Sequence, residues 1–142
     1  MNFITPLVAV GELGDALDLD ALEKQGIKAV LSLAPVNLDG AVEHHLQLEV
    51  ADRVPLPFEI ISTALAFIKH HVQLGQRVLL HCEMGISRSP SLAVCYLHET
   101  QGLSIEDAVI HVQSVRPKAE PHPALMESIR GYFRQQSASP ET

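Results

Sequence analysis

Hydrophobic residues recur along the chain in two patterns, one typical of strands and one typical of helices. Largely apolar runs occur at residues 7–10, 27–33 and 78–80, and residues 46–50 alternate apolar and polar side chains. An apolar run is typical of a strand buried on both faces of a sheet, whereas alternation indicates a strand with one face in water. We therefore predict four strands over these ranges.

The segments between and after the strands show the three-to-four-residue period of amphipathic helices. The clearest is Phe58–Leu74, in which five apolar residues form one stripe and Gly75 follows as a terminator. Ser104 to Asp107 has the sequence of a capping box at the start of another helix. The predicted helices are 18–25, 58–74, 90–99, 104–115 and 123–135.

This alternation of strands and helices is the pattern of an α/β domain with a largely parallel sheet. The 142 residues suit a single domain. We expect a central, mostly parallel sheet of four to five strands flanked by helices, built from residues 1–136, with a polar tail at residues 137–142. Ligands bind beyond the carboxyl ends of the strands in such sheets, so the segment after residues 78–80 is the candidate site.

The charge balance narrows the range of partners. The formal net charge is −7, which argues against a nucleic-acid partner because Lys and Arg would have to neutralise its phosphates. There is no basic leader, and no apolar stretch approaches the ~18 residues of a membrane span. We expect a monomeric cytoplasmic protein that binds no nucleic acid and no membrane.

Histidine and cysteine are the residues that could bind a metal ion, and two cysteines could also form a disulfide. None of the eight histidines is paired at the i, i+4 spacing of a helical zinc site, so we expect no metal and no other cofactor. Cys82 and Cys95 are too few for a disulfide framework. Cys95, on a predicted helix, is interpreted as a core residue, with a redox partnership with Cys82 as the alternative.

Chemistry concentrates in residues 81–90, which read HCEMGISRSP. Cys82 follows a buried strand, and the backbone N–H groups of residues 83–88 can converge on an anion before the next helix begins. That helix adds the positive end of its dipole, and Gly85 allows a tight turn. Both features favour a thiolate as well as a bound phosphate, so Cys82 is the candidate nucleophile.

Two further side chains complete the candidate site. Arg88 can bind two phosphate oxygens with its planar fork, which Lys cannot reproduce. Ser89 can donate a hydroxyl hydrogen bond to the cysteine sulfur. The phosphate-binding residues are expected to be Glu83, Met84, Gly85, Ile86, Ser87 and Arg88.

The segment from His81 to Ser89 resembles the signature of the cysteine-based protein tyrosine phosphatases, which is His-Cys, five residues, Arg and Ser or Thr. The short chain and the strand before the loop look like the dual-specificity branch, and the resemblance covers Ile4 to about Phe133. It implies a protein tyrosine phosphatase-like fold and metal-independent hydrolysis through a cysteinyl-phosphate. It also implies that His81 orients the loop through hydrogen bonds to backbone.

The resemblance further implies a general acid about thirty residues before the nucleophile. Asp52 precedes Cys82 by 30 residues and lies in the irregular segment 51–57, so we assign it that role. Glu49 is the reserve candidate and Asp39 a more distant one. Arg116 corresponds to a rim arginine of the family and is expected either to bind substrate phosphate or to face the end of its own helix. His122 stands where relatives carry Asn.

The loop composition also bears on the substrate. Glu83 is acidic and no lysine lies between Cys82 and Arg88, which disfavours a polyphosphorylated ring. We expect phosphotyrosine, and also phosphoserine or phosphothreonine, in proteins. The alternatives are a small-molecule or lipid phosphate, a non-catalytic phosphate-binding module of the same fold, and a rhodanese-type sulfurtransferase, in which a loop cysteine also acts.

Overall fold

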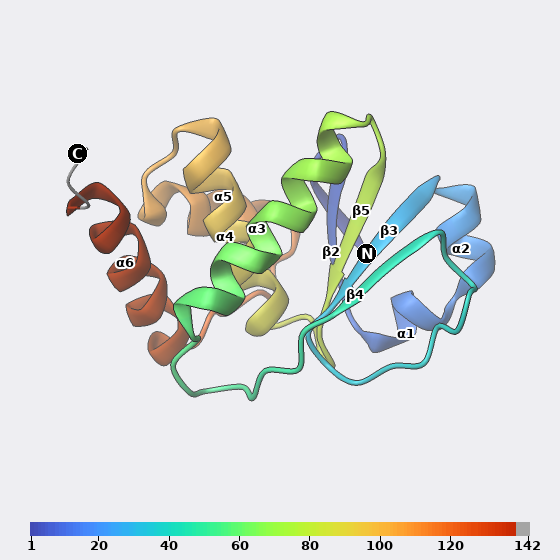
Figure 1. The fold of residues 1–142 in the computed structure, drawn as a ribbon, viewed down its shortest axis with the longest axis horizontal. Helices are drawn as coiled ribbons and strands as arrows, with labels where there is room; N and C mark the ends of the chain where they lie inside the picture. The colour runs from blue at the N-terminus through green and yellow to red at the C-terminus, as the bar shows by residue number, and fades with distance from the viewer. Residues whose placement is uncertain (139–142) are drawn as a thin grey trace.

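The computed structural model describes residues 1–138, which form a sheet between two sets of helices (Figure 1). The strands are β1 (Asn2–Thr5), β2 (Val8–Gly11), β3 (Ile27–Ser32), β4 (His44–Gln47) and β5 (Arg77–His81). Their order across the sheet is β1-β2-β5-β3-β4, with β1 antiparallel to β2 and the other pairs parallel. The predicted α/β fold with a mostly parallel sheet is confirmed.

Helices cover both faces of this sheet, unequally. One face carries the two short helices α1 (Leu13–Leu17) and α2 (Leu19–Lys24). The opposite face carries the larger group, α3 (Phe58–Gln73), α4 (Arg88–Gln101), α5 (Ile105–Val115) and α6 (Pro123–Ala138). Figure 1 shows this group on the left of the sheet and the short pair on the right.

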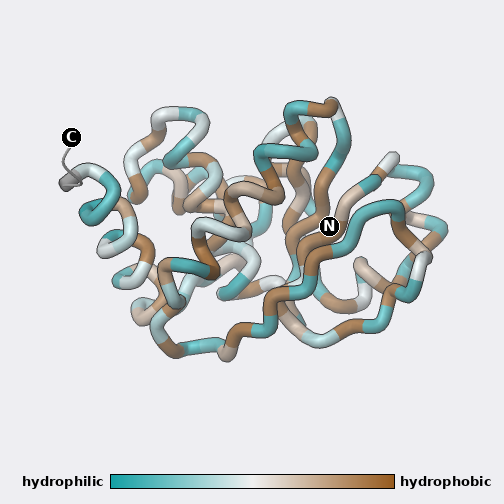
Figure 2. Tube along the Cα trace, in the orientation of Figure 1, coloured by the Kyte–Doolittle hydropathy of each residue, from teal (hydrophilic) through white to brown (hydrophobic). Residues whose placement is uncertain are grey.

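Successive side chains of the central strands point alternately to the two faces of the sheet. Because helices cover both faces, the sequences of these strands are largely apolar. Leu79 packs with the core under α1 and α2, whereas its neighbour Leu80 packs with the core under the larger helical group. Val30 and Leu31 divide in the same way on β3. Hydrophobic segments accordingly run along the inner strands in Figure 2. Each such buried side chain contributes roughly 1.5–3 kcal/mol.

Strand β4 lies earlier in the sequence than predicted, at His44–Gln47 instead of 46–50. Parallel pairing with β3 sets this register, since Ala29 pairs with His44 and Ser32 pairs with Gln47. Because β3 ends at Ser32, regular strand pairing ends there as well. The alternating apolar pattern of residues 46–50 therefore predicted the strand correctly but misplaced its bounds.

Three other features differ from the prediction. Strand β1 was not predicted, and neither was α1, because an edge strand of four residues and a helix of five have too few positions to show a period. Helix α6 extends to Ala138, so residues 137–138 are helical and are not part of a tail. The rest of the predicted tail, residues 139–142, lies outside the described residues.

Candidate active site

The candidate loop joins the middle strand of the sheet to the helix that follows it. Strand β5 ends at His81, the loop occupies residues 82–87, and α4 begins at Arg88. Strands β2 and β3 flank β5 and end at the same edge, at Gly11 and Ser32. The loop therefore lies at the carboxyl end of the parallel strands, as predicted.

All six carbonyl groups of residues 82–87 accept hydrogen bonds from protein donors. In order along the loop, the donors are His81 Nδ1 (3.1 Å), Leu13 N (3.0 Å), Arg116 Nη2 (3.5 Å), Arg116 Nε (2.7 Å), Glu120 N (2.6 Å) and Ser91 N (2.9 Å). These donors come from β5, the start of α1, α4 and the segment after α5. The outer side of the loop is thus fixed by the surrounding fold.

The backbone N–H groups of the loop point towards its inner side. Peptide units in the described residues are trans, so a C=O that points outward directs the following N–H inward. Within residues 1–138, the amides of residues 83, 84, 86, 87 and 88 donate to no protein acceptor, and that of Gly85 donates to Cys82 Sγ at 3.3 Å. Convergent amides of this kind form an anion-binding nest.

The sulfur of Cys82 sits at the bottom of this nest. The residue is 2% exposed, and its Sγ lies 3.3 Å from Ser89 Oγ and 3.5 Å from Ser89 N. Ser89 Oγ also donates to the carbonyl of Gly11 at 3.2 Å. The serine hydroxyl can therefore direct its single proton either to Gly11 or to the sulfur, according to the charge that the sulfur carries.

The geometry of the loop leaves no room for a side chain at Gly85. Its φ is +66°, and a Cβ built there would lie 2.7 Å from the carbonyl oxygen of Gly11 and would also meet Arg116 Nη2. Both the left-handed backbone and the close approach of β2 require glycine. The sequence predicted the tight turn but not the approach of Gly11.

Arg88 extends along the side of the nest. Its Nη1 donates to the carbonyls of Val50 at 3.0 Å and of Leu33 at 3.5 Å, which holds the guanidinium over the loop. Its Nε is buried and has no protein partner within the described residues. A buried cationic donor without an acceptor is costly, so this atom favours an oxyanion beside Cys82.

Asp52 and the loop face each other across a cleft of about 400 Å³. The cleft is lined by Asp52, Arg53, Cys82, Glu83, Met84, Ile86, Ser87 and Arg88. A second cleft of about 400 Å³ shares four of these residues and extends towards Glu120 and His122. The structure thus brings Asp52, Cys82 and Arg88 to one cleft, and the catalytic roles assigned to them stay predictions.

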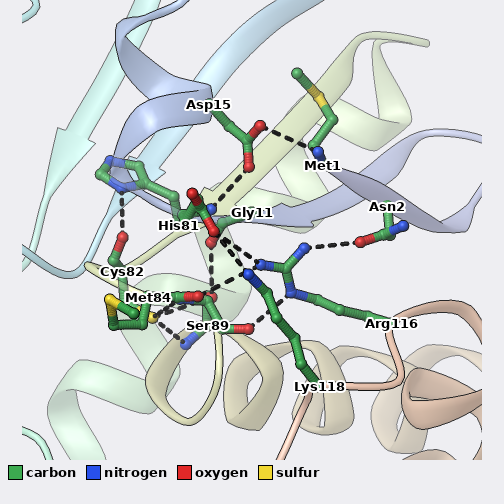
Figure 3. A network of polar contacts seen from close by, with 12 residues as sticks. Met1, Asn2, Gly11, Asp15, His81, Cys82, Met84, Ser89, Arg116 and Lys118 are labelled. Carbon is green, nitrogen blue, oxygen red and sulfur yellow. Dashed lines mark hydrogen bonds and ion pairs between the residues drawn. The ribbon is translucent and has the colours of Figure 1, made fainter.

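His81 is buried beside the loop. Its Nε2 lies 2.6 Å from Ser32 Oγ. Its Nδ1 lies 3.1 Å from the carbonyl oxygen of Cys82, as Figure 3 shows. Burial lowers the pKa of this imidazole, so the neutral form is favoured. The predicted hydrogen bond from His81 to loop backbone is therefore present.

Arg116 does not lie where the prediction placed it. Its side chain is buried behind the loop, where it donates to the carbonyl of Gly85 and, at 2.7 Å, to Asn2 Oδ1 (Figure 3). Glu12 lies 3.9 Å away as a counter-charge. The guanidinium does not line the cleft with Cys82, because the loop itself separates the two. Arg116 supports the outer wall of the nest and is not placed to contact substrate.

Several contributors to the site were missed by sequence reasoning. The carbonyl of Gly11 accepts a hydrogen bond from the Ser89 hydroxyl, and the amide of Leu13, at the start of α1, donates to the loop. His122 accepts the Ala124 amide with Nδ1 at 3.1 Å and so caps α6, while its own amide donates to Ser87 Oγ at 3.0 Å. Apart from the contact between His122 and Ala124, these contacts join segments far apart in the sequence, and no local pattern signals them.

A larger pocket lies in another part of the molecule. It has a volume of about 760 Å³, lies between α4, α5 and α6, and is lined by residues such as His98, Ile105 and Phe133. It contains no cysteine and shares no residue with the loop. Within the described residues, no group of three or more His, Cys, Asp or Glu side chains could hold a metal ion, and no helix is long and apolar enough to cross a bilayer.

Comparison with known proteins gives consistent results. A sequence profile described as "Dual specificity phosphatase, catalytic domain" matches residues 8–135. The chain is 31% identical to dual specificity protein phosphatase 1B of Arabidopsis thaliana, over 87% of this chain and 75% of the relative. It is also 31% identical to phosphatidylglycerophosphate phosphatase PTPMT2 of the same plant, over 88% of this chain, and to human dual specificity protein phosphatase 7, over 92%. The chain spans 59% and 32% of the lengths of those two proteins.

Solved structures show the same fold. The human tyrosine phosphatase-like serine/threonine/tyrosine-interacting protein superposes with a TM-score of 0.89 at 27% identity, covering 97% of this chain and 98% of that one. Human DUSP28 superposes with a TM-score of 0.88 at 24% identity, covering 98% and 100%.

Proposed function

The chain belongs to the dual-specificity phosphatase family, and we propose that it hydrolyses phosphate monoesters of tyrosine, and of serine or threonine, in proteins. The observation that carries the proposal is the nest around Cys82 Sγ, whose carbonyls are all held outward. Inward amides, the N-terminus of α4 and Arg88 together stabilise the equatorial oxygens of a phosphoryl group in transit. No metal takes part in the proposed reaction.

The first step is transfer of the phosphoryl group to sulfur. The Cys82 thiolate attacks phosphorus, so a P–S bond forms as the P–O bond to the substrate side chain breaks. Asp52, across the cleft, donates its proton to the departing oxygen. The inward amides and Arg88 bind the three equatorial oxygens throughout.

The second step regenerates the thiolate. Asp52, now a carboxylate, takes a proton from a water molecule, whose oxygen attacks phosphorus and releases inorganic phosphate as the P–S bond breaks. Negative charge returns to the sulfur of Cys82. Ser89 Oγ, 3.3 Å away, can then donate to the thiolate instead of to Gly11.

Charges around the cleft favour a protein substrate over a polyphosphorylated one. The two clefts that share residues are lined by three carboxylates, those of Asp52, Glu83 and Glu120. Among the described residues that line them, the only Lys or Arg side chains are Arg53 and Arg88. Additional phosphates would meet these carboxylates. A lipid carrying a single phosphate monoester is the second candidate, because PTPMT2, a relative at 31% identity, is by its name a phosphatidylglycerophosphate phosphatase.

The test begins with an aryl phosphate in the presence of a metal chelator. We expect hydrolysis by the natural chain and none by Cys82→Ser, in which the nucleophile is a poorly ionised hydroxyl. Hydrolysis by Cys82→Ser at the natural rate would contradict the mechanism. No hydrolysis by the natural chain, with phosphopeptide binding retained, would support the non-catalytic module.

Substrate class is then tested with three substrates at equal concentration: a phosphotyrosine peptide, the matching phosphothreonine peptide and vesicles containing phosphatidylglycerophosphate. The proposal expects the highest kcat/KM with the phosphotyrosine peptide. A preference for the vesicles would favour the lipid-phosphate candidate.

A cytoplasmic monomer remains part of the proposal. Both cysteines are free thiols, as is usual in a reducing compartment. Cell fractionation tests the location, and a solution mass of 15.5 kDa tests the monomer.

A further inference from the structure

Three polar side chains form a row across three neighbouring strands, ending at the nucleophile's own peptide group. His45 Nε2 on β4 lies 2.7 Å from Ser32 Oγ on β3. The same hydroxyl lies 2.6 Å from His81 Nε2 on β5. His81 Nδ1 lies 3.1 Å from the carbonyl oxygen of Cys82. His45 is exposed, whereas Ser32 and His81 are fully buried.

Strand register places the three on one face of the sheet. Ser32 is the direct partner of His81 across the β3–β5 pair. His45 is the partner of Val30, two residues before Ser32, and is therefore the diagonal neighbour of Ser32 on the same face. This face packs against α1 and α2, since Val30 belongs to their core. Cys82 packs with the opposite core.

The direction of each hydrogen bond in the row follows from the groups at its inner end. A carbonyl oxygen can only accept, so His81 Nδ1 carries a proton and donates to Cys82. Burial lowers the pKa of His81 and favours the neutral ring, whose Nε2 is then an acceptor. Ser32 has a single hydroxyl proton, which goes to His81 Nε2. His45 Nε2 must therefore donate to Ser32 Oγ.

We propose that His45 and Ser32 are positioning residues for the phosphate-binding loop. The directed chain runs from His45 Nε2–H to Ser32 Oγ–H to His81 Nε2, and it holds His81 in the tautomer whose Nδ1–H binds the Cys82 carbonyl. That bond turns the Cys82–Glu83 peptide unit so that the Glu83 N–H points into the nest. The inference rests on the proposed phosphatase function for its kinetic consequences only.

Reversing the direction of these hydrogen bonds would change the protonation of His81, so the exposed residue at position 45 affects the loop. If the group at position 45 could only accept, Ser32 would donate to it, and His81 Nε2 would have to donate to Ser32. His81 would then become a buried cation, or its Nδ1 lone pair would face the Cys82 carbonyl and lose that bond. Either outcome alters the first peptide unit of the nest.

A matched pair of variants separates donor from acceptor. His45→Gln retains an N–H donor, and His45→Glu, of the same length, offers only acceptors when ionised. The adjacent His44 is the control position, because its ring packs against His71, 4.6 Å away between centroids, and does not touch Ser32. His44→Glu introduces the same charge one residue away.

The direct readout is the protonation of the His81 ring nitrogens, measured by ¹⁵N NMR on labelled protein. We expect a protonated Nδ1 and a bare Nε2 in the natural chain, in His45→Gln and in His44→Glu. His45→Glu is expected to protonate Nε2. A protonated His81 Nε2 in the natural chain, or an unchanged His81 in His45→Glu, would overturn the proposal whether or not the chain is a phosphatase.

The kinetic readout uses the aryl phosphate. His45→Glu should lower kcat by about tenfold, the scale of one hydrogen bond, with KM little changed. His45→Gln and His44→Glu should stay within about twofold of the natural kcat. Equal loss in His45→Glu and His44→Glu would assign the effect to charge alone and refute the role of the chain. Absence of hydrolysis by the natural protein would refute the proposed function and leave the NMR result to decide the positioning role.

Discussion

The two cysteines are equally buried but lie in opposite chemical surroundings. Cys82 is 2% exposed and Cys95 is 0% exposed, and both are free thiols. Cys82 Sγ lies among N–H and O–H groups of Gly85 and Ser89 at the start of α4. Cys95 lies in the middle of the same helix, within the apolar core.

The two thiols therefore differ in the hydrogen-bond donors around them and not in their burial. Burial raises the pKa of Cys95 far above its usual range, and the nearby Glu99 adds to this effect. Around Cys82, the amides that would stabilise a thiolate are the same amides that would bind phosphate. The structure therefore gives Cys95 no support as a redox partner and favours a core role.

Replacing each cysteine by alanine in turn should give the largest difference in activity. We expect Cys82→Ala to lower kcat/KM for an aryl phosphate by about 10⁴-fold or more, as loss of a nucleophile usually does. Cys95→Ala removes one buried heavy atom and should cost about 1 kcal/mol of unfolding free energy with near-natural activity. Steady-state kinetics and urea unfolding measure both. A Cys95→Ala enzyme as inactive as Cys82→Ala would erase the distinction.

Removing the acid should leave the nucleophile working but slowly. Asp52→Asn is expected to lower kcat by about 10²-fold for a phosphate ester with a poor leaving group. The loss should be much smaller for an aryl ester whose leaving group departs without a proton. If kcat falls equally for both esters, Asp52 is not the proton donor, and Glu49 becomes the next residue to test.

Adding a side chain at Gly85, where the loop contacts β2, should lower both activity and stability. Gly85→Ala places a Cβ against Gly11 at a positive φ, so we expect a loss of about 2 kcal/mol or more of unfolding free energy and a lower kcat. Gly102→Ala is the matched control, because its φ is +72° but no atom lies within 4 Å of the added Cβ. The control should show backbone strain alone, about 1–2 kcal/mol, with natural kcat. A natural kcat in Gly85→Ala would show that the approach of Gly11 does not shape the nest.

The smallest effect is a pH dependence specific to Cys95. Its pKa in the folded state is raised above the ordinary value of 9.0, so the unfolded chain loses this proton first as pH rises. Its contribution to stability is complete below pH 9.0 and falls above that pH, by up to about 1.4 kcal/mol per pH unit. Urea unfolding between pH 8 and 10.5 should show a steeper decline in the natural chain than in Cys95→Ala. Parallel declines would mean that Cys95 ionises normally in the folded state.

The fold and the centre of the site could be predicted because their information is local. Residues 81–89 carry the nucleophile, the turn glycine and the arginine in one segment, next to a strong apolar strand. Asp52 required the family resemblance, since no local pattern indicates that Asp52, and not Glu49 or Asp39, faces the loop. The register of β4 depended on β3, and its bounds were therefore misplaced.

Arg116 shows what a local pattern cannot decide. An arginine at a helix end can face solvent, substrate or protein, and here its partners, Asn2 and Gly85, are 114 and 31 residues away. The row from His45 to His81 likewise exists only because three strands lie in one register. Such contacts arise from tertiary packing, which the sequence specifies only as a whole.

Because the carbonyls of the loop are bound by donors from elsewhere in the domain, the loop would not keep its conformation outside the domain. These donors come from the start of α1, β5, α4 and the segment that follows α5. A synthetic peptide of residues 81–89 would retain every reactive group but none of the donors from outside that segment, so its carbonyls would turn freely towards water and towards one another. The proposed hydrolysis therefore depends on the assembled domain and cannot be carried by this segment alone.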